Sequence, residues 1–212
     1  HEKITQIDGG YSTLMKNIKV IKKQGLNLGI SVVISKYNLN EMEKIAETLI
    51  NKTDNISFVR VIPAGRAKIL EKELYLDKKE YKKYIKTLIN LREKGIGAGY
   101  LKKAETFEFL ITNKKNYQMC SAGFTNIGIR SDLIVTPCLA LVEYPIGDLK
   151  KNSLKEILDS DEIKFFREFP KKDSELYTCK GCKHIDFCRG GCRAHAFYST
   201  EDITAKDPGC LL

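Results

Sequence analysis

The stretch "CKGCKHIDFCRGGC", residues 179–192, places four cysteines within fourteen positions and constrains the fold more than any other feature of the chain. The other cysteines are Cys120, Cys138 and Cys210, so none of the seven precedes residue 120. Seven is an odd number, and the start "HEKITQIDGG" has no secretory signal, which argues against a complete disulfide framework. Clustered thiols in a reducing compartment are typical metal ligands.

The cysteine count separates the two metals that thiolates usually bind. One zinc ion would use four cysteines and leave three idle, whereas two iron–sulfur clusters use up to eight ligands. Gly181, Gly190 and Gly191 lie inside the run, and backbone without a side chain can approach the sulfides of a cluster closely. The spacing favours iron–sulfur clusters, and zinc stays the alternative.

The first hundred residues alternate between helical and strand patterns. Helices are predicted at 12–24, at 40–50 and from the capping box of Asp77 and Glu80 to near Gly95. Strands are predicted at 28–35 and 56–62, the first of them apolar on both faces as in a buried parallel strand. This alternation predicts βα units on a parallel sheet, with two strands too few for a closed barrel.

Two of these helices have a clear apolar face. Leu14, Ile18 and Ile21 share one face of the first helix, and Tyr81 and Tyr84 of the third are predicted to be core residues.

From about residue 100 the predicted elements become short. Residues 126–138 read as a hairpin with Ser131 and Asp132 at its turn. A second capping box, Ser153 and Glu156, opens one or two amphipathic helices. Their apolar residues are Leu154, Ile157, Leu158, Phe165, Phe166 and Phe169.

The formal net charge of +9 comes mostly from lysines that are scattered among acids and apolar residues. This pattern is typical of solvated faces, and it lacks the aromatic residues on a basic stripe that would favour nucleic acid. The longest apolar runs have the length of strands, so no membrane contact is expected.

The spacing C-x2-C-x5-C-x3-C, with a later cysteine and a distant earlier pair, resembles the SPASM domain of radical SAM enzymes. The phrases "CSAGFTNIGI", "TPC", "IGDLKKNSLKEIL" and "CRGGC" agree with it, and "FVRVIPAGRA" is similar to the sixth strand of the radical SAM barrel. The resemblance implies an α/β fold: residues 1–100 as the C-terminal part of a partial (β/α)6 barrel, and residues 101–212 as a small α+β SPASM domain.

The resemblance also implies two auxiliary [4Fe-4S] clusters. Cys179, Cys182, Cys188 and Cys210 would ligate the outer cluster, and Cys120, Cys138 and Cys192 the inner one. Some relatives have a further cysteine a few residues before the first, where this chain has Lys114, Lys115 and Asn116. The fourth inner iron is then open to substrate, or it takes a ligand from elsewhere. His184 and His195 are expected beside the ligands or at the surface.

Other features of the family are missing. No C-x3-C-x2-C motif is present to cleave S-adenosylmethionine, so this chain alone is expected to be inactive. We expect it to be the C-terminal portion of a longer enzyme that supplies S-adenosylmethionine binding and a third cluster. Leu133 stands where the family usually has glycine. Leu139 stands where sulfatase-maturing members have an aspartate that acts as a base, which argues against that activity.

The resemblance implies that the intact parent modifies a peptide or protein by radical chemistry, in the cytoplasm, with an acidic leader peptide as a conceivable partner. Candidate residues facing S-adenosylmethionine or substrate are Ser31, Ser35, Asn38 and Arg66, near the C-terminal ends of the strands. Two rival hypotheses are a zinc-thiolate binding module and an electron-transfer iron–sulfur protein.

Overall fold

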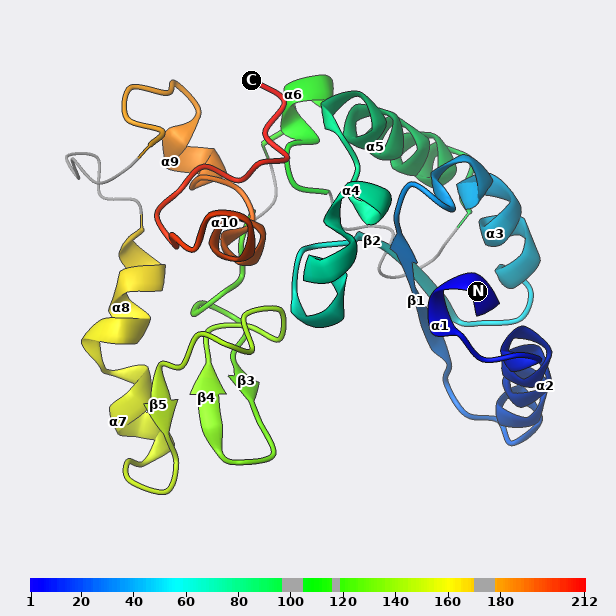
Figure 1. The fold of residues 1–212 in the computed structure, drawn as a ribbon, viewed down its shortest axis with the longest axis horizontal. Coiled ribbons are helices and arrows are strands. Elements are labelled where there is room, and N and C mark those ends of the chain that lie inside the picture. Colours follow the sequence, from blue (N-terminus) through cyan, green and yellow to red (C-terminus); the bar gives the residue numbers. More distant parts are fainter. Residues whose placement is uncertain (97–104, 116–118, 170–177) are drawn as a thin grey trace. The chain divides into compact units, whose positions relative to one another are not determined.

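The computed structural model describes residues 1–96, 105–115, 119–169 and 178–212 (Figure 1). The chain forms two compact units, His1–Val61 with Lys72–Ala104, and Ile62–Glu71 with Glu105–Leu212. Up to residue 93 the elements are α1 (Glu2–Thr5), α2 (Gly10–Lys23), β1 (Gly29–Ile34), η1 (Leu39–Glu41), α3 (Met42–Leu49), β2 (Asn55–Arg60), η2 (Gly65–Leu70), α4 (Glu71–Leu74) and α5 (Lys78–Glu93). The later elements are α6 (Phe109–Thr112), β3 (Gly128–Ile129), β4 (Ile134–Thr136), β5 (Gly147–Asp148), α7 (Leu154–Leu158), α8 (Asp161–Glu168), α9 (Ile185–Cys188) and α10 (Arg193–Thr200).

The first unit is built on a parallel pair of strands, which confirms the predicted βα alternation. β1 pairs with β2 in register from Gly29 opposite Asn55 to Ile34 opposite Arg60. Ile34, Ile56 and Phe58 are buried on one face of this pair. The same core contains the buried apolar faces of α3 and α5.

The prediction that the first strand is buried on both faces was wrong. Val33 is 51% exposed and Val59 is 40% exposed, and Ser31 lies on the same open face. Leu14 of α2 is likewise 39% exposed, whereas Ile18 is buried. An apolar run shows that a face can be buried, but only tertiary packing decides whether an element covers it.

The predicted capping box at the start of α5 is confirmed. Asp77 Oδ1 accepts the N–H of Glu80 at 2.7 Å, and Glu80 Oε2 accepts the N–H of Asp77 at 2.9 Å. Tyr81 and Tyr84 are core residues, as predicted. The Tyr84 hydroxyl donates to the carbonyl oxygen of Phe58 at 3.0 Å, which ties α5 to β2.

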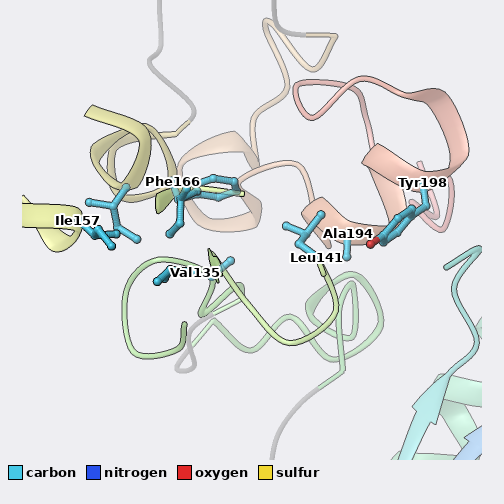
Figure 2. Close-up of a cluster of buried hydrophobic side chains, with 9 residues drawn as sticks. Val135, Leu141, Ile157, Phe166, Ala194 and Tyr198 are labelled. Carbon is cyan, nitrogen blue, oxygen red and sulfur yellow. The ribbon is translucent and has the colours of Figure 1, made fainter. Parts of the chain in front are cut away.

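The second unit has its own hydrophobic core, six residues of which are labelled in Figure 2. Strand β4 of the antiparallel sheet β3–β4–β5 and the helices α7, α8 and α10 contribute to it. The capping box of Ser153 and Glu156 is confirmed, and two helices follow it. Leu154, which the sequence placed among the apolar residues of these amphipathic helices, is 39% exposed. The core residues are Ala122, Val135, Leu141, Ile146, Ile157, Ile163, Phe166, Ala194 and Tyr198.

The turn between β3 and β4 has the predicted residues at its centre. The N–H of Leu133 donates to the carbonyl of Arg130 at 2.9 Å, which closes a turn over Ser131 and Asp132. Leu133 itself has a φ of 71°, in the left-handed region that glycine favours. At the position where the resemblance leads us to expect glycine, a leucine therefore adopts a backbone conformation that glycine favours.

Replacing Leu133 by glycine should raise the free energy of unfolding by about 1 kcal/mol. The left-handed region costs a residue with a side chain about 1–2 kcal/mol, and glycine avoids this cost. Part of the gain is offset because glycine also has more conformational freedom in the unfolded chain. Urea unfolding of the cluster-free protein would measure it. Leu139→Gly is the control, since Leu139 is 79% exposed and its φ is not positive. Equal effects of the two variants would contradict the prediction.

Candidate iron–sulfur sites

The four cysteines predicted to hold the outer cluster line a single pocket of the second unit. Cys179, Cys182, Cys188 and Cys210 all contribute to a cavity of about 330 Å³. Phe107 and Phe109 supply part of its apolar wall. The structure thus gathers residues that lie up to 31 positions apart, 179 to 210, around one space.

Local backbone structure presents these thiols to the pocket. The N–H of Cys182 donates to the carbonyl of Cys179 at 3.0 Å, so a tight turn brings the first two cysteines together. Cys188 is the last residue of α9, and its N–H donates to the carbonyl of His184 at 2.7 Å. Cys210 comes from the C-terminal segment and is buried together with Cys188.

The thiol of Cys188 is in an environment that penalises negative charge. Burial and the neighbouring Cys210 raise the pKa of Cys188 to about 12. A thiolate is the form that binds a metal, so a bound cation is what would stabilise deprotonated cysteines here. Burial and the charges of Lys115 and Lys183 lower the pKa of His184.

The three cysteines predicted for the inner cluster gather in a second place. Cys120, Cys138 and Cys192 all pack against the hydrophobic core of Figure 2. Burial raises the pKa of Cys138, and the nearby Cys120 adds a smaller increase. Cys192 is the N-cap residue of α10. Four of the seven cysteines thus line one pocket, and the other three pack on one hydrophobic core.

Each group has a buried nitrogen without a hydrogen-bond partner beside it. His184 Nδ1 belongs to a residue that lines the outer pocket. Arg193 Nε belongs to a residue that lines a small cavity of about 10 Å³ together with Cys120. Buried polar atoms are rarely left unsatisfied unless an additional group is present. The sulfur atoms of a cluster accept hydrogen bonds, so the residues of both sites fit such a group.

Among the described residues, no three side chains of His, Cys, Asp or Glu converge closely enough to hold a single metal ion. Four thiolates around one zinc share one metal atom, whereas the thiolates of a cubane cluster each bind a different iron and lie farther apart. The four cysteines of the outer pocket surround one cavity of about 330 Å³, and either arrangement would draw on these same thiols.

The residues predicted to face S-adenosylmethionine or substrate have varied surroundings. Asn38 Oδ1 accepts the N–H of Ser35 at 2.8 Å, and Asn38 Nδ2 donates to the carbonyl of Val33 at 2.9 Å, so this pair shapes the turn after β1. Ser31 lies exposed on the open face of the sheet, and Arg66 is exposed in η2 of the other unit.

The positions that bear on the inner cluster's fourth ligand are only partly described. Lys115 lies 5.8 Å from the centre of the Phe187 ring, near the outer group. Asn116 lies outside the described residues. Leu139, directly after Cys138, is 79% exposed and offers no base.

Sequence reasoning missed two residues of these sites. Asp207 is fully buried and accepts the N–H of Cys192 at 2.8 Å. Arg193 donates to the backbone carbonyls of Ile203 and Ala205, both at 2.8 Å. The available signal was their position in the sequence: Asp207 lies three residues before Cys210, and Arg193 directly follows Cys192.

Comparison with known families identifies this region. Residues 120–183 match the family model SPASM, an iron-sulfur cluster-binding domain. This part of the chain is therefore similar to SPASM domains. The matched range contains Cys120, Cys138, Cys179 and Cys182, and the remaining three cysteines follow it.

Curated proteins that are similar over nearly the whole chain include AdoMet-dependent heme synthases and PqqA peptide cyclases. The chain is 23% identical to the AdoMet-dependent heme synthase of Oleidesulfovibrio alaskensis, over 99% of the chain and 57% of that protein. It is 23% identical to the PqqA peptide cyclase of Granulibacter bethesdensis, over 100% of the chain and 56% of that protein. The chain therefore spans a little over half the length of these relatives.

A solved structure shares the fold. The structure of anSMEcpe with bound AdoMet superposes with a TM-score of 0.62 at 19% identity, over 94% of this chain and 54% of that one. This likeness supports the α/β fold that the sequence predicted. Within the described residues, every helix is too short or too polar to cross a membrane.

Proposed function

We propose that this chain, with its SPASM domain, holds two auxiliary [4Fe-4S] clusters and works within a radical SAM enzyme that modifies a peptide or protein. The observation that carries the proposal is the grouping of the cysteines. Four of them line one cavity, and the other three pack on one hydrophobic core. Cys179, Cys182, Cys188 and Cys210 would hold the outer cluster, and Cys120, Cys138 and Cys192 the inner one.

The residues of the chain would bind and shield these groups. The seven cysteines would supply thiolates, and the phenylalanines of the outer pocket would limit the access of water. His184 Nδ1 and Arg193 Nε are placed to donate hydrogen bonds toward the sulfur atoms. When bound, such clusters accept electrons or hold a substrate atom. The three-cysteine site leaves one iron for a ligand outside this set.

The proposal extends to the architecture. Residues 1–100 would belong to a partial (β/α)6 barrel, which the parallel β1–β2 pair and its helices support. Residues 101–212 would form the SPASM domain that holds the auxiliary clusters. The proposed boundary near residue 100 lies outside the described residues.

Cleavage of S-adenosylmethionine would need residues that this sequence lacks, since no C-x3-C-x2-C motif is present. We therefore propose that S-adenosylmethionine and a third cluster bind to another part of the intact enzyme, and that this chain alone is inactive. Ser31 and Arg66, both exposed, stay candidates for contacts with S-adenosylmethionine or substrate. Ser35 and Asn38 are engaged with each other, which supports a structural role for them.

The proposed partner is a peptide or protein, because a relative acts on the PqqA peptide. Lys79, Lys82, Lys83 and Lys86 line an open groove along α5, and an acidic leader segment would complement their charge. High salt should abolish the binding of a glutamate-rich peptide to this groove. A cytoplasmic location is part of the proposal, since a reducing compartment preserves free thiolates.

The test is to reconstitute the chain anaerobically with iron and sulfide and to determine iron, acid-labile sulfide and zinc per polypeptide. About eight irons and eight sulfides, with an EPR signal after reduction, are expected for two four-iron clusters. Stoichiometric zinc without sulfide, in protein isolated without oxygen, would instead make the chain a zinc-thiolate binding module.

A further inference from the structure

Asp207 is a buried carboxylate that the proposed ligand set does not include. Its exposed fraction is 0%. Oδ2 accepts the N–H of Cys192 at 2.8 Å, and Oδ1 accepts the N–H of Gly209 at 2.8 Å. His195 Nδ1 lies 2.7 Å from Oδ1. A buried charge is tolerated only when such partners compensate its lost hydration, so the site is built around this carboxylate.

The backbone of Asp207 is held as firmly as its side chain. Its N–H donates to the carbonyl of Gly190 at 3.1 Å, and its carbonyl accepts the N–H of Cys210 at 2.9 Å. Gly190 in turn is two residues after Cys188. Asp207 is therefore hydrogen-bonded to Cys192, to Cys210 and to Gly190, which lies two residues after Cys188.

These three cysteines belong to different proposed clusters. Cys188 and Cys210 line the outer pocket, whereas Cys192 packs on the hydrophobic core with the inner group. Arg193 fastens the same two segments, because its guanidinium donates to the carbonyls of Ala205 and Gly190. The run 188–193 and the run 203–210 thus form one hydrogen-bonded unit that carries ligands of both sites.

The close approach depends on Gly191. Its φ is +84°, and a Cβ at this position would lie 2.7 Å from both Cβ and Oδ2 of Asp207. Any other residue would push the carboxylate away from the N–H of Cys192. The backbone is therefore shaped to admit Asp207 at this point.

We propose that Asp207 is the positioning residue for both clusters, so that the outer and inner sites assemble as one unit. This inference rests on the proposed function. Asp207 does not touch iron; it orients Cys192 through the N–H of that residue and Cys210 through its own backbone. Its negative charge, close to both groups of cysteines, also lowers the reduction potential of a cluster bound there.

The test compares Asp207→Asn with the wild-type chain after anaerobic loading with iron and sulfide. Asparagine keeps the shape but presents an amide N–H₂ in place of one oxygen, so it cannot accept from both Cys192 and Gly209 as the carboxylate does. The EPR signal of each cluster is assigned from Cys182→Ala and Cys138→Ala, which each keep one site. We expect the two signals to fall together, at least threefold, and the remaining clusters to have a higher reduction potential.

Asp202→Asn is the matched control, because Asp202 accepts the N–H of Thr204 in the same segment and is exposed. His195→Gln is the milder second variant, expected to lower both signals in the same proportion. Loss of one signal only, or unchanged occupancy and potential in both variants, would overturn the positioning role. A wild-type chain that binds no iron and sulfide would overturn the proposed function itself, so the two failures are distinguishable.

Discussion

Changing Cys182 to alanine should remove about four of about eight irons, together with the matching sulfide, and leave the second cluster in place. Cys182 lines the outer pocket with three other cysteines. Removal of one thiolate ligand greatly weakens the binding of a four-iron cluster. Cys138→Ala should remove the other half, because Cys138 packs on the hydrophobic core with the inner group. The two EPR signals should therefore disappear separately.

Lys180→Ala is the control for this pair, since Lys180 lines the same pocket but carries no thiol. Its iron and sulfide content should equal that of the wild-type chain. If Cys182→Ala and Cys138→Ala deplete the same signal, the division of the cysteines into four and three would be wrong. If neither variant loses iron, the cysteines would not be the ligands.

Changing Gly191 to alanine should lower the free energy of unfolding by about 3 kcal/mol, the sum of a left-handed backbone penalty and overpacking. A Cβ at this position would lie 2.5 Å from Cζ of Phe107 and 2.7 Å from the Asp207 side chain. Both neighbours are buried, so neither can move aside cheaply. Chemical denaturation of the cluster-free chain would measure the loss.

Gly181→Ala separates the two contributions. Gly181 has a φ of +79°, but nothing lies within 4 Å of an added Cβ. This variant should lose only the backbone term of about 1 kcal/mol. Equal losses in the two variants would mean that Phe107 and Asp207 adjust to the added methyl group, against the packing that the structure describes.

Local patterns were enough to predict much of this fold. The two capping boxes and the turn over Ser131 and Asp132 follow from residues that are neighbours in sequence. The parallel strand pair follows from the alternation of helical and strand patterns. The resemblance to SPASM domains implied the division of the cysteines into four and three, and their assignment to two clusters stays a prediction. In the capping boxes and in the turn, the interactions that fix the structure span few residues.

The remaining features depend on contacts between distant segments. The open face of β1 could not be foreseen, because its apolar sequence is the same whether or not another element covers Val33. The left-handed backbone of Leu133 contradicts the preference of leucine and is imposed by the hairpin. Asp207 looks like an ordinary polar loop residue until the fold buries it beside Cys192.

The four cysteines of the outer pocket differ in exposure. Cys188 and Cys210 are buried, whereas Cys179 and Cys182 are only partly covered. Oxidation of cysteine follows the access of the oxidant to the sulfur. Damage by air would therefore begin at the edge formed by the "CKGC" turn and reach the deeper pair last. Protein aged in air should accumulate chains with sulfur oxidised at this turn while the thiols of the C-terminal segment remain intact.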